Sequence, residues 1–341
     1  MVATPSAGQG FYEAGIEEIE RKVRSSPDNP DAYFKKALYL QSAGQLDEAL
    51  SSVKQAINLN PVPDYLFTEA DLLYQKEQYE LALARISRAQ ILGGDYPDLW
   101  HLMSKLNYLQ GNLEAALDEV KVAIGKYPDL DFYCTKGKIE WALSDTTTAL
   151  QSFNKSKNSP SSKYESLKYL AVIHMELEDY DNAREYLLAN LDSHPTDREL
   201  LMAKAALYTR MIQPDSALII YQILRDNDST DWVPLYELAL VHFQRRRYDS
   251  TLYYTDRTLQ LNKDHLPSIL TQARVYDRRT YYGTSIKKYQ EILEIDSTYT
   301  PAVEELAKLR GKIAYLQKIR ENREANSQVE IISPTKPAIE N

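Results

Sequence analysis

The chain has 341 residues, and 43% of them are hydrophobic, which is enough to form a core over most of its length. Its formal net charge of −9 argues against a general nucleic-acid-binding protein, because neutralising phosphate groups requires clustered Lys and Arg. The single cysteine, Cys134, excludes an internal disulfide framework and a zinc site built from several cysteines.

The N-terminal segment comprises two predicted parts. Residues 1–10 lack the charged and apolar regions of a signal peptide and predict a flexible linker. Two localisations stay open: the protein is cytoplasmic if Met1 is its native start, and periplasmic or in the cell envelope if an export leader was removed. No apolar run approaches the length of a membrane span, so we expect no transmembrane segment in this chain. Residues 11–29 predict a capping helix that ends before Pro27.

Residues 30–299 contain two series of small residues with a period of 33 or 34. The first series is Ala37, Ala70, Ser104, Gly137, Ala171, Ala205, Ala239 and Ala273. The second lies twelve residues further along in each case and is Ala49, Ala82, Ala116, Ala149, Ala183, Ala217, Thr251 and Ser285. Because the two series stay in phase, they mark structural repeats. The repeats start at Pro30, Pro63, Pro97, Leu130, Tyr164, Arg198, Trp232 and Leu266.

Within each repeat, apolar residues recur at helical spacing over two segments, which predicts two amphipathic helices. The small residues let the paired helices approach closely. Pro61, Pro128 and Pro195 end the second helix in three repeats, since proline cannot continue a helix interior. One repeat cannot bury its apolar face alone, so neighbouring repeats must stack. The pattern predicts an all-α solenoid of about eight helix–turn–helix repeats.

These repeats resemble the tetratricopeptide repeat, in which positions 8, 20 and 27 are small and position 32 is proline. The two series occupy positions 8 and 20, Trp100 occupies the tryptophan position 4, and Ala56, Ala89 and Ala123 occupy position 27. The resemblance implies a right-handed superhelix that acts as a protein-interaction scaffold.

The C-terminal segment predicts a second cap and a tail. Residues 300–325 predict a capping helix with a single apolar face. That face consists of Val303, Leu306, Leu309, Ile313, Leu316 and Ile319. Residues 326–341 lack helical periodicity and contain Pro334 and Pro337, so they predict a disordered tail.

Motifs for catalysis are absent from the sequence: it contains no HExxH, GxSxG or GxxxxGK[ST] pattern. We therefore expect neither an enzyme nor a bound metal or cofactor. His174 and His242 both occupy position 11, but in repeats that are two apart, which favours packing over a shared ligand site.

The resemblance implies that positions 2, 5, 9, 12 and 13 of the first helices line a concave groove. The predicted partner-binding residues are Phe34, Phe67, Tyr74, His101, Tyr108, Trp141, Met175, Tyr236 and Phe243. Such an aromatic surface suits a peptide or helix of a partner protein. For Phe34, Phe67 and Trp141, partner contact and simple packing both remain open.

A second hypothesis concerns arginines in the last two repeats. A patch of Arg245, Arg246, Arg247, Arg274 and Arg278 predicts an anion-binding surface. The alternative is that these residues are solvated turn residues, with Asp249, Asp256 and Asp277 nearby as partners.

The sequence thus predicts a non-enzymatic scaffold that holds a peptide or helix of a partner in its groove. An alternative is a structural subunit of a multi-protein envelope complex, tethered as a lipoprotein. Binding of a chaperone's C-terminal tail is not predicted, because Leu38 and Thr68 stand where the family's carboxylate clamp needs Asn. The sequence names neither the partner nor the oligomeric state.

Overall fold

The computed structural model describes residue 15 and residues 18–332, with side chains described through residue 324. Within those ranges, all regular secondary structure is α-helical. The chain divides into two compact units, which we call the N-terminal unit (to Asn190) and the C-terminal unit (from Leu191). The predicted linker at residues 1–10 lies outside the described residues. Of the predicted capping helix at residues 11–29, residues 18–25 are helical.

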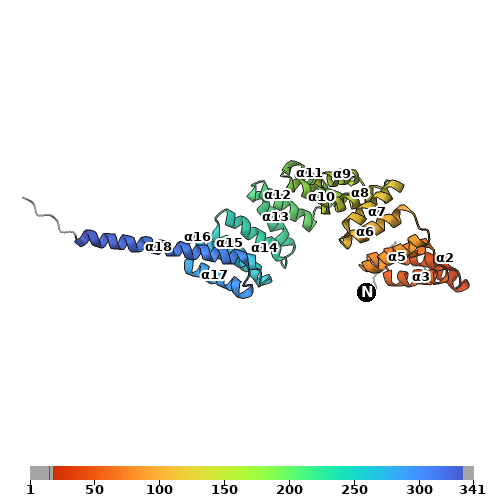
Figure 1. Cartoon of the computed structure of the whole chain (residues 1–341), viewed down its shortest axis with the longest axis horizontal. Helices are drawn as coiled ribbons and strands as arrows, with labels where there is room; N and C mark the ends of the chain where they lie inside the picture. The colour runs from red at the N-terminus through yellow and green to blue at the C-terminus, as the bar shows by residue number, and fades with distance from the viewer. Residues whose placement is uncertain (1–14, 16–17, 333–341) are drawn as a thin grey trace, which may run out of the picture. The chain divides into compact units, whose positions relative to one another are not determined.

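The N-terminal unit consists of consecutive helix pairs (Figure 1). Its helices are α2 Pro30–Ser42, α3 Leu46–Leu59, α4 Pro63–Gln75, α5 Tyr79–Ile91, α6 Pro97–Leu109, α7 Leu113–Lys126, α8 Leu130–Ala142, α9 Thr146–Ser156, α10 Lys163–Glu176 and α11 Tyr180–Leu191, whose last residue begins the next unit.

The C-terminal unit continues the same pattern and ends in one long helix. Its helices are α12 Arg198–Arg210, α13 Pro214–Asn227, α14 Trp232–Gln244, α15 Tyr248–Leu261, α16 Leu266–Arg278, α17 Tyr282–Ile295 and α18 Thr300–Ile332. The first helix of each repeat begins at its predicted start, except that α10 begins at Lys163, one residue early. The predicted all-α repeat solenoid is therefore confirmed.

The turn between the two helices of a repeat has the same conformation throughout. Position 15 has a positive φ in all eight repeats, but only Gly44 and Gly111 are glycines there. The other six are Glu77, Ser144, Glu178, Ile212, Arg246 and Thr280, with φ between 56° and 65°. Residues other than glycine adopt this conformation at a cost of about 1–3 kcal/mol each, so the stacked repeats must enforce it.

Both series of small residues lie inside the helix pairs. Every member of either series is buried. At Gly137 even one additional methyl group would come within 2.9 Å of the Phe153 ring on α9. Close approach of paired helices thus depends on these positions, as the sequence pattern predicts.

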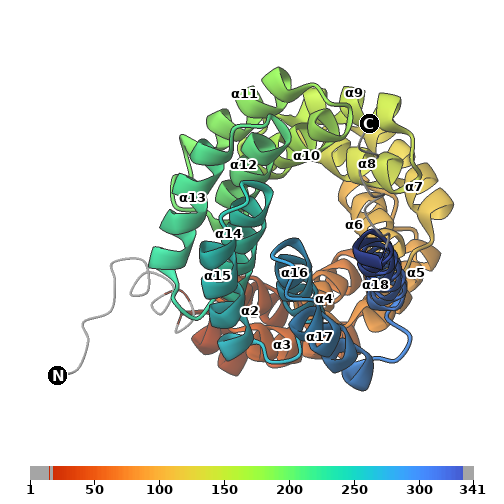
Figure 2. The ribbon, with the colours of Figure 1, turned by 90° about the vertical axis from the view of Figure 1, so that its left-hand side faces the viewer.

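First helices of successive repeats form one layer within each unit. In the N-terminal unit α4 contacts α6, α6 contacts α8, and α8 contacts α10; in the C-terminal unit α14 contacts α16. Figure 2 shows α6, α8 and α10 on the inner side of the N-terminal unit, with α7 and α9 on its outer side. Side chains of the first helices therefore form the inner surface of that unit.

Helix α18 packs on α17 through Ala302, Leu306 and Leu309, which are all buried. Val303 and Leu316, predicted on the same apolar face, are 46% and 42% exposed. The predicted helix end at residue 325 needs correction, because α18 continues to Ile332. No proline interrupts the sequence between Pro301 and Pro334, so nothing forces an earlier end. The rest of the predicted tail lies outside the described residues.

No helix in the described part of the chain is both long enough and apolar enough to cross a bilayer.

Candidate partner-binding site

The inner surface of the N-terminal unit combines aromatic and charged side chains. Tyr74, Tyr108 and Trp141 occupy position 12 of three consecutive repeats, and each is only partly buried. Lys105 and Lys138 occupy position 9 on α6 and α8. A repeat of 33 or 34 residues returns equivalent positions to the same helix face, so these side chains line up along the unit. We call these five residues the inner face.

The two lysines of the inner face differ in their partners. Lys138 forms an ion pair with Glu165 (2.9 Å), and its ammonium lies 5.7 Å from the centre of the Tyr169 ring. Burial alone would lower the pKa of Lys138, but the bond to Glu165 raises it overall. Burial also lowers the pKa of Lys105, and the charge of Asp71 opposes this only in part.

Lys105 has no ion pair among the described residues. The nearby carboxylate of Asp71 instead accepts hydrogen bonds from Gln41 (2.6 Å) and Gln75 (2.9 Å). A mostly buried ammonium without a carboxylate at contact distance favours an anionic group from outside. The sequence pattern placed Lys105 at position 9, but only the structure distinguishes it from the paired Lys138.

Two predicted binding residues are buried instead. His101 is 8% exposed, its Nε2 lies 2.7 Å from the Thr135 hydroxyl, and its ring packs on Phe132. Burial lowers the pKa of His101 to about 3, so it is neutral at physiological pH. Met175 is also 8% exposed. Each side chain offers little surface to a partner, so partner contact through either of them stays a prediction.

Phe34 and Phe67 each pack on a neighbouring aromatic ring. The Phe34 ring centre lies 4.6 Å from that of Tyr65, and the Phe67 ring lies edge-on to Tyr96 at 5.5 Å. Both side chains keep a partly exposed surface while contacting the buried cluster of α2–α6. They therefore contribute to stability whether or not a partner touches them.

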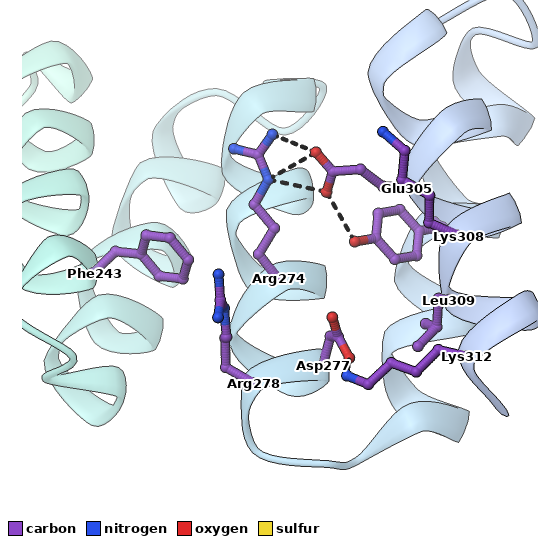
Figure 3. A pocket seen from close by; sticks show the side chains of 9 residues that line it. Phe243, Arg274, Asp277, Arg278, Glu305, Lys308, Leu309 and Lys312 are labelled. Atoms are coloured by element: carbon purple, nitrogen blue, oxygen red, sulfur yellow. Dashed lines mark hydrogen bonds and ion pairs between the residues drawn. The ribbon is translucent and has the colours of Figure 1, made fainter. Parts of the chain in front are cut away.

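In the C-terminal unit, Tyr236 packs edge-on against His265 at 4.6 Å. Phe243 instead lines a pocket of about 430 Å³ that we call the basic pocket (Figure 3). The remaining lining residues are Arg274, Asp277, Arg278, Tyr289, Glu305, Lys308, Leu309 and Lys312. Phe243, Arg274 and Arg278, which the sequence assigned to two separate surfaces, thus share one pocket.

The residues of the predicted arginine patch divide between a turn and the basic pocket. Arg245 forms an ion pair with Asp215, while Arg246 and Arg247 are exposed in the turn before α15. None of these three lines the basic pocket. Only Arg274 and Arg278, both on α16, line it.

The repeat geometry defines the class of protein, a helical-repeat scaffold. Residues 7–62 and 67–131 match the tetratricopeptide repeat family. The match covers these residues alone, and the described chain as a whole has the fold of a tetratricopeptide-repeat solenoid. Members of this family bind protein partners and are generally non-enzymatic. Among curated proteins, none matches this sequence.

Solved structures of tetratricopeptide proteins share the fold. The C-terminal part of such a protein from Cytophaga hutchinsonii is 12% identical, with 70% of this chain and 99% of that chain covered and a TM-score of 0.59. One from Parabacteroides merdae is 14% identical, with 71% of this chain and 97% of that chain covered and a TM-score of 0.52. Pseudomonas aeruginosa pilF is 16% identical, with 63% of this chain and 94% of that chain covered and also a TM-score of 0.52. At these identities the likeness concerns the fold alone.

Proposed function

We propose that the N-terminal unit binds a peptide or helical segment of a partner protein along its inner face. The observation that carries this proposal is Lys105, a mostly buried cation without an ion pair among the described residues, which lies among partly exposed aromatic side chains. Aromatic rings supply contact area at low conformational cost, and the ammonium would select a segment with a carboxylate.

The mechanism is recognition on a preformed surface. Helices α4, α6 and α8 hold the inner face through buried contacts, so the scaffold itself loses little conformational freedom on binding. The bound segment then lies across several repeats, and its side chains contact one repeat after another.

The test selects peptides from a displayed random library against the full chain and measures their affinities by fluorescence anisotropy. Lys105→Gln and Trp141→Ala should each weaken binding about tenfold or more. Tyr127→Ala is the matched control, because Tyr127 is a 61% exposed aromatic residue at the end of α7, outside the inner face. Thermal melts of each variant separate lost contact from lost folding. Unchanged affinity of both variants for all selected peptides would refute the proposal.

A further inference from the structure

We propose that the basic pocket of the C-terminal unit is a second binding site, which takes an acidic peptide segment through Arg278 and Lys308. This site lies on different helices from the inner face and does not depend on the function proposed above. Helix α18 would then do more than cap the solenoid, because it contributes four of the lining residues. These are Glu305, Lys308, Leu309 and Lys312.

Two ion pairs in the basic pocket are already complete. Arg274 donates from Nε and Nη2 to both oxygens of Glu305 at 2.6–3.1 Å, and the Tyr289 hydroxyl donates to the same carboxylate at 3.0 Å. Although burial alone would raise the pKa of Glu305, these bonds lower it. Lys312 donates to Asp277 at 2.7 Å. These four charged groups neutralise one another and form the fixed frame of the pocket.

The two remaining cations lack such compensation. Arg278 has no ion pair among the described residues, and in Figure 3 its guanidinium stands between the Phe243 ring and Asp277 with no bond drawn to it. In the described part of the chain Lys308 pairs only with Glu304, at 3.6 Å, and its side chain is 75% exposed. Among the lining residues four cations face two carboxylates, and counting Glu304 beside Lys308 leaves an excess of one positive charge, in a chain whose net charge is −9.

The shape and chemistry of the pocket favour a peptide over other anions. A volume of about 430 Å³ accommodates side chains, whereas a bilayer surface would need cations on an open face. The partly exposed Phe243 ring adds an apolar wall beside Arg278, which a small inorganic anion would leave unused. Guanidinium groups bind carboxylates bidentately, so Arg278 would anchor the segment and Lys308 would contribute a second, weaker contact.

The test titrates the full chain with a fluorescein-labelled peptide in which two Glu residues flank a Leu, and with the same peptide carrying Gln in place of Glu. The Glu peptide should bind, with an affinity that falls as salt is added, and the Gln peptide should bind at least about tenfold more weakly. Arg278→Gln and Lys308→Gln should each weaken binding of the Glu peptide, and Arg278→Gln should do so by about tenfold or more. Circular dichroism confirms that the variants fold.

Two control variants make the test specific. Arg279→Gln removes the same charge one residue away, but Arg279 pairs with Asp249 and does not line the pocket, so binding should not change. Lys105→Gln tests the inner face. If it abolishes Glu-peptide binding while Arg278→Gln does not, the basic pocket is not the site, and the function proposed for the N-terminal unit survives. Absence of Glu-peptide binding, equal binding of the Gln peptide, or binding only to phosphatidylserine vesicles would each overturn the inference.

Discussion

The hydroxyl of Ser285 on α17 donates a hydrogen bond to the carbonyl oxygen of Ala273 on α16, at 2.8 Å. Ser104 on α6 makes the reverse bond to the carbonyl of Ala116 on α7, at 2.7 Å. Both bonds join positions 8 and 20 of one repeat, the two positions that carry small residues along the chain. The backbones of paired helices are therefore so close that a serine side chain reaches the opposite carbonyl.

This proximity predicts how Ser285 responds to substitution. Ser285→Ala should destabilise by no more than about 1 kcal/mol, because it removes one hydrogen bond and restores the usual alanine. Ser285→Val should destabilise by about 1–3 kcal/mol, because its added methyl groups must separate the helices. Urea denaturation measures both; equal effects would mean that the spacing of the helices is not limiting.

A buried charge in the second series should be far more damaging. Ala183→Glu on α11 places a carboxylate where the native side chain is 0% exposed, so we expect a loss of at least about 3 kcal/mol. Ala307→Glu on α18 makes the same change at an exposed helical position and should leave the midpoint nearly unchanged. Similar denaturation midpoints for the two variants would contradict the assigned repeat phase.

The turn position offers a stabilising change. Ile212 is 86% exposed at φ 57°, so Ile212→Gly relieves backbone strain without losing packing and should stabilise by about 1 kcal/mol. Ile219→Gly on α13, where Ile219 is 59% exposed within a helix, should instead destabilise by about 1 kcal/mol. The sign of the shift in thermal midpoint distinguishes them, and destabilisation at both sites would show that the turn is not strained.

His101 predicts a specific pH dependence. Burial holds its pKa at about 3, below the ordinary 6.5, so the unfolded chain takes up its proton first as the pH falls. The stability that neutral His101 contributes is therefore fully present above about pH 6.5. Between about pH 6.5 and about pH 3, the free energy of unfolding falls by at most about 1.4 kcal/mol per pH unit as the pH is lowered. His101→Gln should flatten the stability curve across that window. Parallel curves for the two proteins would indicate that His101 is not buried as described.

The repeat pattern predicted the helix pairs because each pair is determined by residues within one repeat. Small residues are needed at positions 8 and 20 wherever the two helices of a repeat touch. It could not predict which inner side chains are free. His101 is buried by Phe132 and Thr135 of the next repeat, and Arg245 is paired with Asp215 of the preceding one. These outcomes depend on how neighbouring repeats stack.

The basic pocket illustrates the same limit at the C-terminus. Sequence reasoning treated residues 300–325 as a cap because their apolar face suggested packing alone. The opposite charges of Glu305 and Lys312 reach Arg274 and Asp277 only once α18 lies against the last repeat. The pocket is thus a product of tertiary packing, although an arginine pair on α16 was visible in the sequence.

Hydrogen exchange of the full chain, with and without a peptide selected for binding, tests the central claim most directly. Binding at the inner face predicts slower exchange in α6 and α8, which carry Lys105, Tyr108 and Trp141, with no change in the outer helices α7 and α9. Lys105→Gln should reduce that protection at a fixed peptide concentration. Protection confined to α7 and α9, or to the C-terminal unit, would contradict partner recognition by the inner face.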